Sequence, residues 1–225
     1  MSGSRQAVTT KKIKDFMSNV VDQYGWQSSS GPKSCGYITP EVLSILKRLK
    51  VSRVCDLGAG NGALAGALLL AGFTAAGVEY DKQGVEIARK NYPSINFYNL
   101  GVQDDPAPVL AGEGMVFDAV VSTEVVEHLF STHLLPVFAR QILRGGGFLV
   151  ISTPYHGYLK NLALSIFNKW DKHHTPLWHG GHIKFWSSKT LTQLLEGNGF
   201  KVTEFHGAGR RPWLWKGMIL VAKAV

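Results

Sequence analysis

Two groups of residues in this chain have types and spacings that suit chemistry. The first is the segment Asp-Leu-Gly-Ala-Gly-Asn-Gly at residues 56–62, which joins an apolar run to a helix-like run. Gly58 permits a tight strand-to-helix turn, Gly60 lets the backbone approach a ligand, and Gly62 lets the helix lie close to the sheet. A turn of this kind predicts a nucleotide-cofactor site.

Two acids narrow the choice of cofactor. Glu79 ends the next strand-like run, at about the 20-residue spacing at which a strand-end acid reaches the hydroxyls of a ribose. Asp56 would repel the pyrophosphate of a dinucleotide and suits a cationic group, such as the ammonium of an amino acid. The pair favours S-adenosylmethionine over NAD.

The second group follows the fourth strand-like run, in the segment Thr-Glu-Val-Val-Glu-His. On a short helix, Glu124, Glu127 and His128 would share one face, and two carboxylates with an imidazole can hold a divalent ion. We expect His182, which precedes the last helix, to fold back as a fourth ligand. Two alternatives stay open: the three side chains are purely structural, or His128 is a metal-free general base.

These motifs resemble those of class I S-adenosylmethionine-dependent methyltransferases, and among them the ubiquinone-biosynthesis type of O-methyltransferase. The likeness covers roughly residues 51–205 and is strongest at DLGAGNG, GVEYD, FDAVVSTEVVEHL, GGGFLVISTPY and GHIKFWSSKTLTQLLEGNGF. It implies that Thr123 lines the methionine end of the cofactor. It also implies a metal site, for Mg, Mn or Zn, because E-x-x-E-H with a later histidine is similar to sites in these enzymes and in small-RNA terminal 2′-O-methyltransferases.

The adenine contact departs from the family pattern. The family often has Asp then Ala after the third strand, where this chain has Gly101 and Val102. We expect the backbone N–H of Val102 to serve the adenine ring, with Gln103 or Asp104 replacing the missing side chain.

The hydrophobic pattern predicts an α/β fold, a doubly wound Rossmann-like sheet of seven strands. Strand-like runs alternate with helical runs, as a parallel sheet requires. The strands are expected at 51–57, 73–79, 94–99, 116–121, 146–151, 200–206 and 217–224, and helices near 61–71, 82–92, 131–143 and 188–198. Another helix should begin with Thr39 as its N-cap and Pro40 in its first turn. The short link between the last two strands requires the final strand to be reversed.

The length suits one methyltransferase domain, residues 1–225. Residues 1–38 form an N-terminal extension that could cap the cofactor, with one apolar helical face in 13–20. Residues 156–186 form an insertion, the expected substrate lid. One helical stripe is expected there, made of Leu159, Leu162, Ala163, Ile166, Phe167 and Trp170, which either packs on the domain or meets a membrane surface. His173, His174 and His179 are expected to be solvated loop residues.

Composition limits the class of protein. The formal net charge of +8 favours an anionic partner or surface but does not choose among nucleic acid, lipid and acidic substrates. Cys35 and Cys55 form no metal-binding or disulfide pattern, and the uncharged stretch 57–78 has too many glycines for a membrane span. We therefore expect a cytoplasmic protein, with peripheral contact to the membrane as an open alternative.

The sequence as a whole favours O-methylation of a small or lipophilic hydroxylated substrate, with His128 and Glu127 as catalytic residues. RNA 2′-O-methylation is the competing reaction, although the chain has no recognisable RNA-binding module. A non-catalytic S-adenosylmethionine-binding protein is the alternative from another class.

Overall fold

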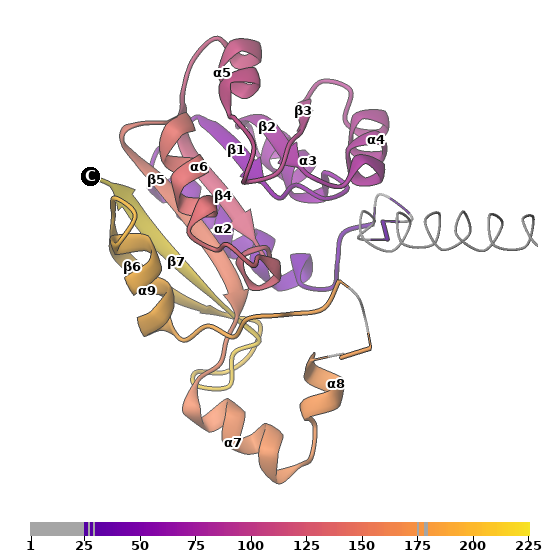
Figure 1. Ribbon diagram of the computed structural model, residues 1–225, viewed down its shortest axis with the longest axis vertical. Coiled ribbons are helices and arrows are strands. Elements are labelled where there is room, and N and C mark those ends of the chain that lie inside the picture. The colour runs from indigo at the N-terminus through magenta and orange to yellow at the C-terminus, as the bar shows by residue number, and fades with distance from the viewer. Residues whose placement is uncertain (1–24, 27, 29, 175, 178–179) are drawn as a thin grey trace, which may run out of the picture.

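The computed structural model describes residues 25–26, 28, 30–174, 176–177 and 180–225 (Figure 1). The apolar face expected in residues 13–20 and His179 lie outside these ranges.

The described residues form one seven-stranded sheet in the order β3-β2-β1-β4-β5-β7-β6. The strands are β1 (Arg53–Leu57), β2 (Thr74–Glu79), β3 (Asn96–Asn99), β4 (Phe117–Thr123), β5 (Leu143–Pro154), β6 (Phe200–Ala208) and β7 (Gly217–Ala224). Strands β1 to β5 pair in parallel, and β7 runs antiparallel to both β5 and β6. The reversed last strand is therefore confirmed.

Helices surround this sheet, and six of them cover its two faces. They are α2 (Cys35–Arg48), α3 (Ala63–Leu70), α4 (Lys82–Asn91), α5 (Ala107–Glu113), the 3₁₀ turn η1 (Val126–His128), α6 (Leu134–Ile142), α7 (Tyr158–Ile166), α8 (Trp170–His174) and α9 (Ser188–Glu196). The apolar residues of α2, α3 and α4 belong to the core on one face, and those of α5, α6 and α9 to the core on the other. The molecule is a three-layer α/β/α domain.

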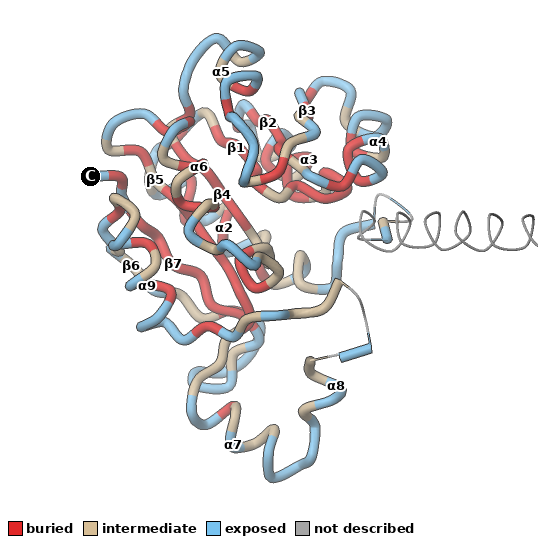
Figure 2. Tube along the Cα trace, in the orientation of Figure 1, coloured by how far each residue is buried: buried red, intermediate tan, exposed pale blue. Residues whose placement is uncertain are grey.

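Burial differs sharply between the sheet and the insertion. Figure 2 shows the central strands largely buried, whereas the chain through α7 and α8 is mostly half-buried or exposed. In Figure 1 these two helices lie beyond the end of the sheet rather than against one of its faces. The insertion is therefore attached to the domain at one edge.

Two expectations about helices are wrong, and one helix was not expected. The helix expected at Thr39 begins at Cys35 and runs through Pro40, because Ile38 belongs to the same buried face as Val42. Helix α5 was not expected; it is short, and its hydrophobic pattern is weak. The stripe in the insertion is divided between α7 and α8, because the chain turns at Asn168, whose φ is 48°.

Strand β1 lies between β2 and β4. Strands β2 and β3 are added on one side of β1, and the chain then crosses over to add β4 on the other side, so the strand order reverses here. Ligands of open α/β sheets bind outside the carboxyl ends of the strands at such a position.

No helix among the described residues is long and apolar enough to cross a membrane.

Candidate active site

The glycine turn after β1 has the backbone conformation that the sequence predicts. Gly58, Gly60 and Gly62 have φ values of 86°, 54° and 81°, which L side chains rarely adopt. A Cβ at Gly58 would lie 2.3 Å from Val125, and one at Gly62 would lie 2.9 Å from Ala88 of α4. The missing side chains thus allow close packing on both sides of the turn.

Glu79 ties this turn to the end of β2. Its carboxylate accepts hydrogen bonds from the backbone N–H groups of Gly60 and Asp81, each at 2.7 Å. Burial raises the pKa of Glu79, and these two bonds oppose the rise. Each carboxylate oxygen has a second acceptor position, so the group can still receive a ligand hydroxyl.

Asp56 is a buried carboxyl at the end of β1, with 2% of its surface exposed. Burial, together with the charge of Glu79, raises the pKa of Asp56 to about 7. A cation next to it would favour the ionised form, because opposite charges stabilise each other strongly in a buried site. The pair of acids is suited to a ligand that carries a positive charge.

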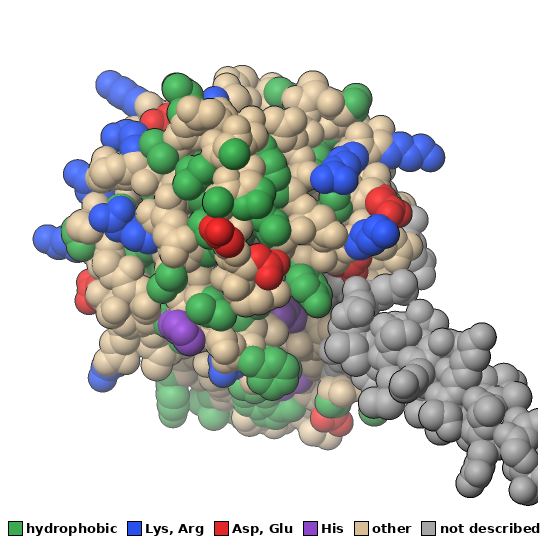
Figure 3. All heavy atoms as spheres, turned by 45° about the horizontal axis from the view of Figure 1, so that its top comes forward, with side chains coloured by type: hydrophobic (Ala, Val, Ile, Leu, Met, Phe, Trp, Pro, Cys, Tyr) green, Lys and Arg blue, Asp and Glu red, His purple; other side chains and the backbone are tan. Residues whose placement is uncertain are grey.

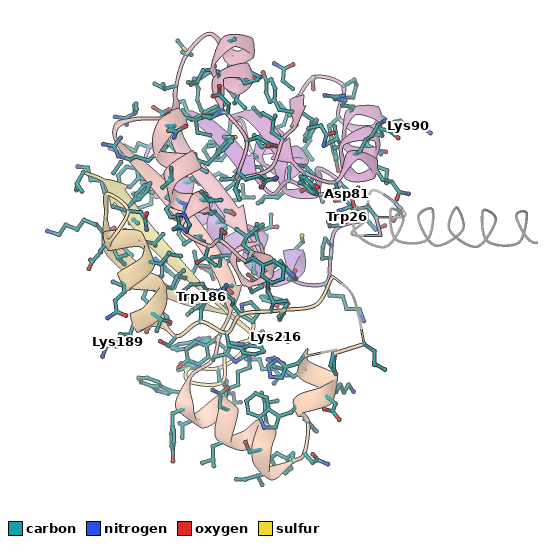
Figure 4. The ribbon with its side chains drawn as sticks, in the orientation of Figure 1. Trp26, Asp81, Lys90, Trp186, Lys189 and Lys216 are labelled. Carbon is teal, nitrogen blue, oxygen red and sulfur yellow. The ribbon has the colours of Figure 1, made fainter. Side chains whose placement is uncertain are left out.

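A strap of the chain, made of residues 25–26, 28 and 30–34, lies on the glycine turn. A Cβ at Gly60 would lie 2.4 Å from the Trp26 ring, and one at Gly84 would lie 3.0 Å from it. The buried side chain of Asn61 donates to the backbone carbonyls of Ser28 and Ser30, at 2.8 and 2.9 Å. Figure 4 places Trp26 beside Asp81. The described part of the N-terminal extension therefore packs against the glycine turn.

Trp26 and Asn61 were not singled out from the sequence. A tryptophan within a segment rich in serine and glycine was the available signal, because such a large apolar side chain has a packing partner in most folds. Tyr37 packs near Gly209 and Lys216, after β6.

At the end of β3, Val102 and Gln103 line the same cavity. Asp104 has a different role, because its carboxylate accepts a hydrogen bond from the backbone N–H of Gly101 at 2.7 Å. Of the two proposed substitutes for the family's adenine contact, Gln103 is the one that faces the cavity.

At the end of β4, Thr123 lines the cavity and Glu124 follows in a left-handed conformation, with φ 56°. The Ser152 hydroxyl of β5 donates to the Glu124 carboxylate at 3.0 Å. Burial raises the pKa of Glu124 to about 7, against the opposing effects of Ser152 and Lys160. A non-glycine residue in this conformation carries backbone strain, which concentrates at functional sites.

Glu127, His128 and His182 come together next to Glu124. One ligand atom of each lies within 4.8 Å of the others, as a metal site requires. The Glu127 Oε1 atom is buried without a hydrogen-bond partner among the described residues and lies 4.0 Å from His182 Nε2. Thr153 donates to the other oxygen at 3.0 Å. His182 therefore lies beside Glu127 and His128.

The expected helical face for the E-x-x-E-H segment is wrong. Glu124 lies outside the 3₁₀ turn η1, which starts at Val126, and Glu124 is not a member of the group within 4.8 Å. The reason is that β4 continues to Thr123 and the chain must reverse sharply after it. Three of the four expected ligands are brought together, and the fourth bonds Ser152.

The cavity formed by these residues has a volume of about 650 Å³ and is continuous along the carboxyl edge of the sheet. It extends from Trp26, Glu79 and Val102 to the acidic end with Glu124, His128 and His182. A ligand of nucleoside size fits this volume with room for a second molecule.

His173 and His174 are not solvated loop residues as expected. Both are half-buried in α8, and the His174 ring lies 4.3 Å from that of Phe185 and 4.9 Å from that of Trp170. Aromatic packing therefore holds them.

The face shown in Figure 3 carries separated positive charges. On the face shown in Figure 3, Lys and Arg side chains lie mainly around the rim and do not gather into one continuous patch. The net charge of +8 does not mark a basic groove on this face.

The comparison with known proteins now identifies the class. The model of the methyltransferase domain family matches residues 35–204, and the chain belongs to this family. It is a methyltransferase that depends on S-adenosylmethionine.

The relatives include ubiquinone biosynthesis O-methyltransferases. That of Roseobacter denitrificans is 27% identical over 198 residues, covering 82% of this chain and 78% of the relative. That of Coxiella burnetii is 23% identical over 215 residues, covering 94% and 91%. Magnesium protoporphyrin IX methyltransferase from Synechocystis PCC 6803, solved with bound SAH, has the same fold, with a TM-score of 0.62, 18% identity and coverage of 83% and 82%.

Proposed function

We propose that the protein methylates a hydroxyl oxygen of a small or lipophilic substrate. The grouping of Glu127, His128 and His182 beside the cofactor cavity carries this proposal, because a purely cofactor-binding protein has no need for it. The names of the ubiquinone-type relatives support an oxygen acceptor.

In this proposal the cofactor occupies the end of the cavity next to the strap. Glu79 accepts hydrogen bonds from the ribose hydroxyls, and Asp56 attracts the ammonium of the methionine part. Gly58 and Gly60 line this end of the cavity, and the missing side chain of Gly60 makes room for the Trp26 ring. Val102 contacts the adenine by its backbone, and Thr123 lines the methionine end.

Methyl transfer breaks the bond between the methyl group and sulfur and forms a bond from the methyl carbon to the acceptor oxygen. The protein must align these atoms and remove the hydroxyl proton. His128 Nδ1 lies 3.2 Å from the Gly181 carbonyl oxygen. In the tautomer that carries its proton on Nδ1, this nitrogen donates to the carbonyl, and Nε2 is the basic nitrogen. In the absence of a metal ion His128 is the proposed base, because burial lowers the pKa of His128, which keeps the ring neutral and able to accept that proton.

Glu127, His128 and His182 also fit a divalent cation, because the unpartnered Oε1 of Glu127 is buried beside two imidazoles. When bound, such an ion supplies Lewis acidity that lowers the pKa of a coordinated hydroxyl. Glu124 contributes negative charge nearby, since its charge raises the pKa of Glu127 after the larger effect of burial.

Turnover with labelled cofactor tests the reaction. The panel contains catechols, quinol precursors and short RNAs, each with and without a chelator. We expect methylation of the hydroxylated small molecules and loss of turnover in the chelator. Methylation of RNA alone would contradict the proposed substrate class, and full activity in the chelator would leave His128 as a metal-free base.

Two glutamine variants locate the ion. Glu127→Gln keeps the shape but removes a charged ligand, so it should raise the metal concentration for half-maximal activity about tenfold or more. Glu124→Gln is the matched comparison and should have a smaller effect, because Ser152 holds that carboxylate apart. An equal rise in the metal concentration for half-maximal activity in both variants would contradict the placement of the ion at Glu127 rather than at Glu124.

A lipophilic substrate suits the exposed apolar side chains of the insertion. Leu159, Ile166 and Phe167 are 50%, 68% and 67% exposed, and the exposed Lys169 and Lys172 lie close in sequence. Such a surface favours association with anionic lipid that weakens with salt. Flotation with neutral and anionic vesicles tests it; protein that never floats contradicts the membrane contact.

A further inference from the structure

Trp26 belongs to the strap and lines the cavity at the same end as Glu79. Its ring lies against two glycines from different elements. A Cβ at Gly60 would clash with the indole, and one at Gly84 of α4 would lie 3.0 Å from it. The missing side chains at these two positions let the indole pack on the backbone. The ring is therefore held between the turn after β1 and the start of α4.

Asn61 holds the backbone of the strap beside this ring. Its side-chain nitrogen donates to the carbonyls of Ser28 and Ser30 at 2.8 and 2.9 Å. Its side-chain oxygen accepts a hydrogen bond from the backbone N–H of Ala63 at 3.3 Å. Only 1% of Asn61 is exposed, so a donor without a partner here would be costly. Asn61 thus ties the strap to the turn after β1.

Further residues that precede β1 line the same cavity. They are Pro32 and Ser34 of the strap and Cys35 at the start of α2. A Cβ at Gly31 would lie 3.3 Å from the Cβ of Ala63, so the strap runs close to the start of α3. Part of the cavity wall at the cofactor end is therefore supplied by the chain before the sheet begins.

The contacts of Glu79 connect this wall with the cofactor. The Glu79 carboxylate bonds the backbone N–H of Gly60, the residue on which the indole packs. A ribose that reaches this carboxylate would therefore lie beside the Trp26 ring. An indole presents a large, rigid apolar surface, which suits contact with a nucleoside.

We propose that Trp26 contacts the nucleoside part of the cofactor and that Asn61 positions Trp26 by holding the strap. The inference rests on the proposed placement of the cofactor at this end of the cavity. It adds a binding residue from outside the sheet, and it gives Asn61 a role that acts through the strap.

Calorimetric titration with SAH tests the contact. Trp26→Ala removes the indole and should weaken SAH binding about tenfold or more. Trp26→Phe keeps an aromatic ring and should restore most of that affinity. Trp213→Ala is the matched control, because Trp213 is 62% exposed and is not among the described residues that line the cavity. Its affinity for SAH should equal that of the wild type.

Asn61→Asp tests the positioning role. The aspartate keeps an acceptor for the Ala63 N–H but replaces the two donors to the strap with an oxygen that repels both carbonyls. We expect SAH binding to weaken about fivefold or more. Asn198→Asp is the control, because its side chain donates to the carbonyl of Leu194 in α9, at 2.7 Å. It should leave SAH affinity unchanged.

A double variant separates positioning from direct contact, because Asn61 also lines the cavity. If Asn61 acts through Trp26, Trp26→Ala with Asn61→Asp should bind SAH within about twofold of Trp26→Ala alone. Losses that multiply would overturn the positioning role.

Tryptophan fluorescence gives a readout that a purely structural Trp26 would not change. A nucleoside beside the indole should alter its emission, so Trp26→Phe should lose most of the fluorescence change that SAH causes in the wild type. Trp213→Phe should keep that change. A full change in Trp26→Phe overturns the contact, and this variant still carries the test if Trp26→Ala does not fold.

Unchanged or tighter SAH binding by Trp26→Ala also overturns the inference, provided that thermal melting shows a folded protein. Glu79→Ala, titrated alongside, separates this inference from the proposed cofactor placement. Weaker binding in Glu79→Ala alone would overturn the role of Trp26 and keep the placement. Unchanged binding in both variants would contradict the placement as well.

Discussion

The two ends of the cavity are built in different ways. The cofactor end consists of short turns directly after β1 and β2, with Asp56 2% exposed and Glu79 held by two backbone N–H groups. The other end, which we propose for the acceptor, includes His182 of the insertion. In that insertion Lys160 is the only buried residue of α7, and α8 has no buried residue. Backbone turns fixed by a sheet leave little freedom, whereas a segment attached at one edge can change its surface at small cost.

This contrast separates the chemistry that the family shares from the choice of substrate. A cofactor common to all members requires a fixed set of contacts, and a rigid sheet edge supplies it. Acceptors differ between members, and loops or insertions on a scaffold accommodate that difference. We therefore expect substitutions at the cofactor end to have large effects on folding and cofactor affinity, and exposed changes in the insertion to have small ones.

The largest effect is expected at Gly58. Gly58→Ala combines a left-handed conformation with a Cβ 2.3 Å from Val125. We expect a loss of roughly 2–5 kcal/mol in unfolding free energy, from backbone strain and overpacking. Gly36→Ala is the control, because a Cβ there meets nothing within 4 Å. Urea denaturation of both variants checks this; equal stability would show that the turn tolerates a side chain.

The next effect is a pH dependence at Asp56. Its pKa rises from 3.8 to about 7 on folding, so between these pH values the folded state binds more protons and stability falls as pH increases. Asp56→Asn should remove this fall and stabilise the ligand-free protein at pH 8 by roughly 2–4 kcal/mol. Denaturation at pH 5 and pH 8 measures it, with the exposed Asp171→Asn as control. Parallel pH profiles of wild type and Asp56→Asn would contradict the prediction.

The same titration predicts how cofactor affinity changes with pH. A bound ammonium favours the ionised form of Asp56, so affinity for SAH should rise between pH 6 and pH 8. The rise should be absent in Asp56→Asn. Calorimetry at the two pH values decides the matter.

A smaller loss is expected at Glu79. Glu79→Ala would leave ribose hydroxyls without an acceptor, at a cost of roughly 1.5–3 kcal/mol, or about tenfold or more in SAH affinity. Glu86→Ala removes the same charge from an exposed position of α4 and should have no such effect. Unchanged affinity in Glu79→Ala, measured by calorimetry, would remove this residue from the cofactor site.

The smallest effect is expected on the exposed side of the insertion. Ile166 is 68% exposed, so Ile166→Ser should change the unfolding free energy by less than about 0.5 kcal/mol. Leu68→Ser places the same side chain in the core of α3, at a fully buried position, and should cost several times more. Similar losses would show that the insertion packs as tightly as the sheet.

Local motifs explain why the cofactor end was predictable from the sequence. The turn at 56–62 and the strand-end acid at Glu79 depend on residues near one another in the chain, and the alternation of strands and helices fixes where they meet. The reversed β7 followed from a short link. These features need only local geometry and the rules of strand connection.

The acceptor end was harder to predict because its contacts are distant in sequence. Glu124 bonds Ser152 of β5, which no spacing around residue 124 indicates. The turn at Asn168 divides an apolar pattern that is continuous in the sequence. Burial of Lys160 depends on the carbonyl of Lys216, 56 positions away. Periodicity identifies which residues share a helical face but not what that face meets.

The left-handed backbone of Glu124 has a consequence for the evolution of the protein. A glycine at this position would relieve the strain of a φ of 56°. It would also remove the carboxylate that lines the cavity at its acidic end. Selection for heat resistance alone would therefore favour glycine, and selection for the proposed catalysis would favour glutamate. Which residue a descendant lineage keeps at this position would record whether it still uses the acceptor end.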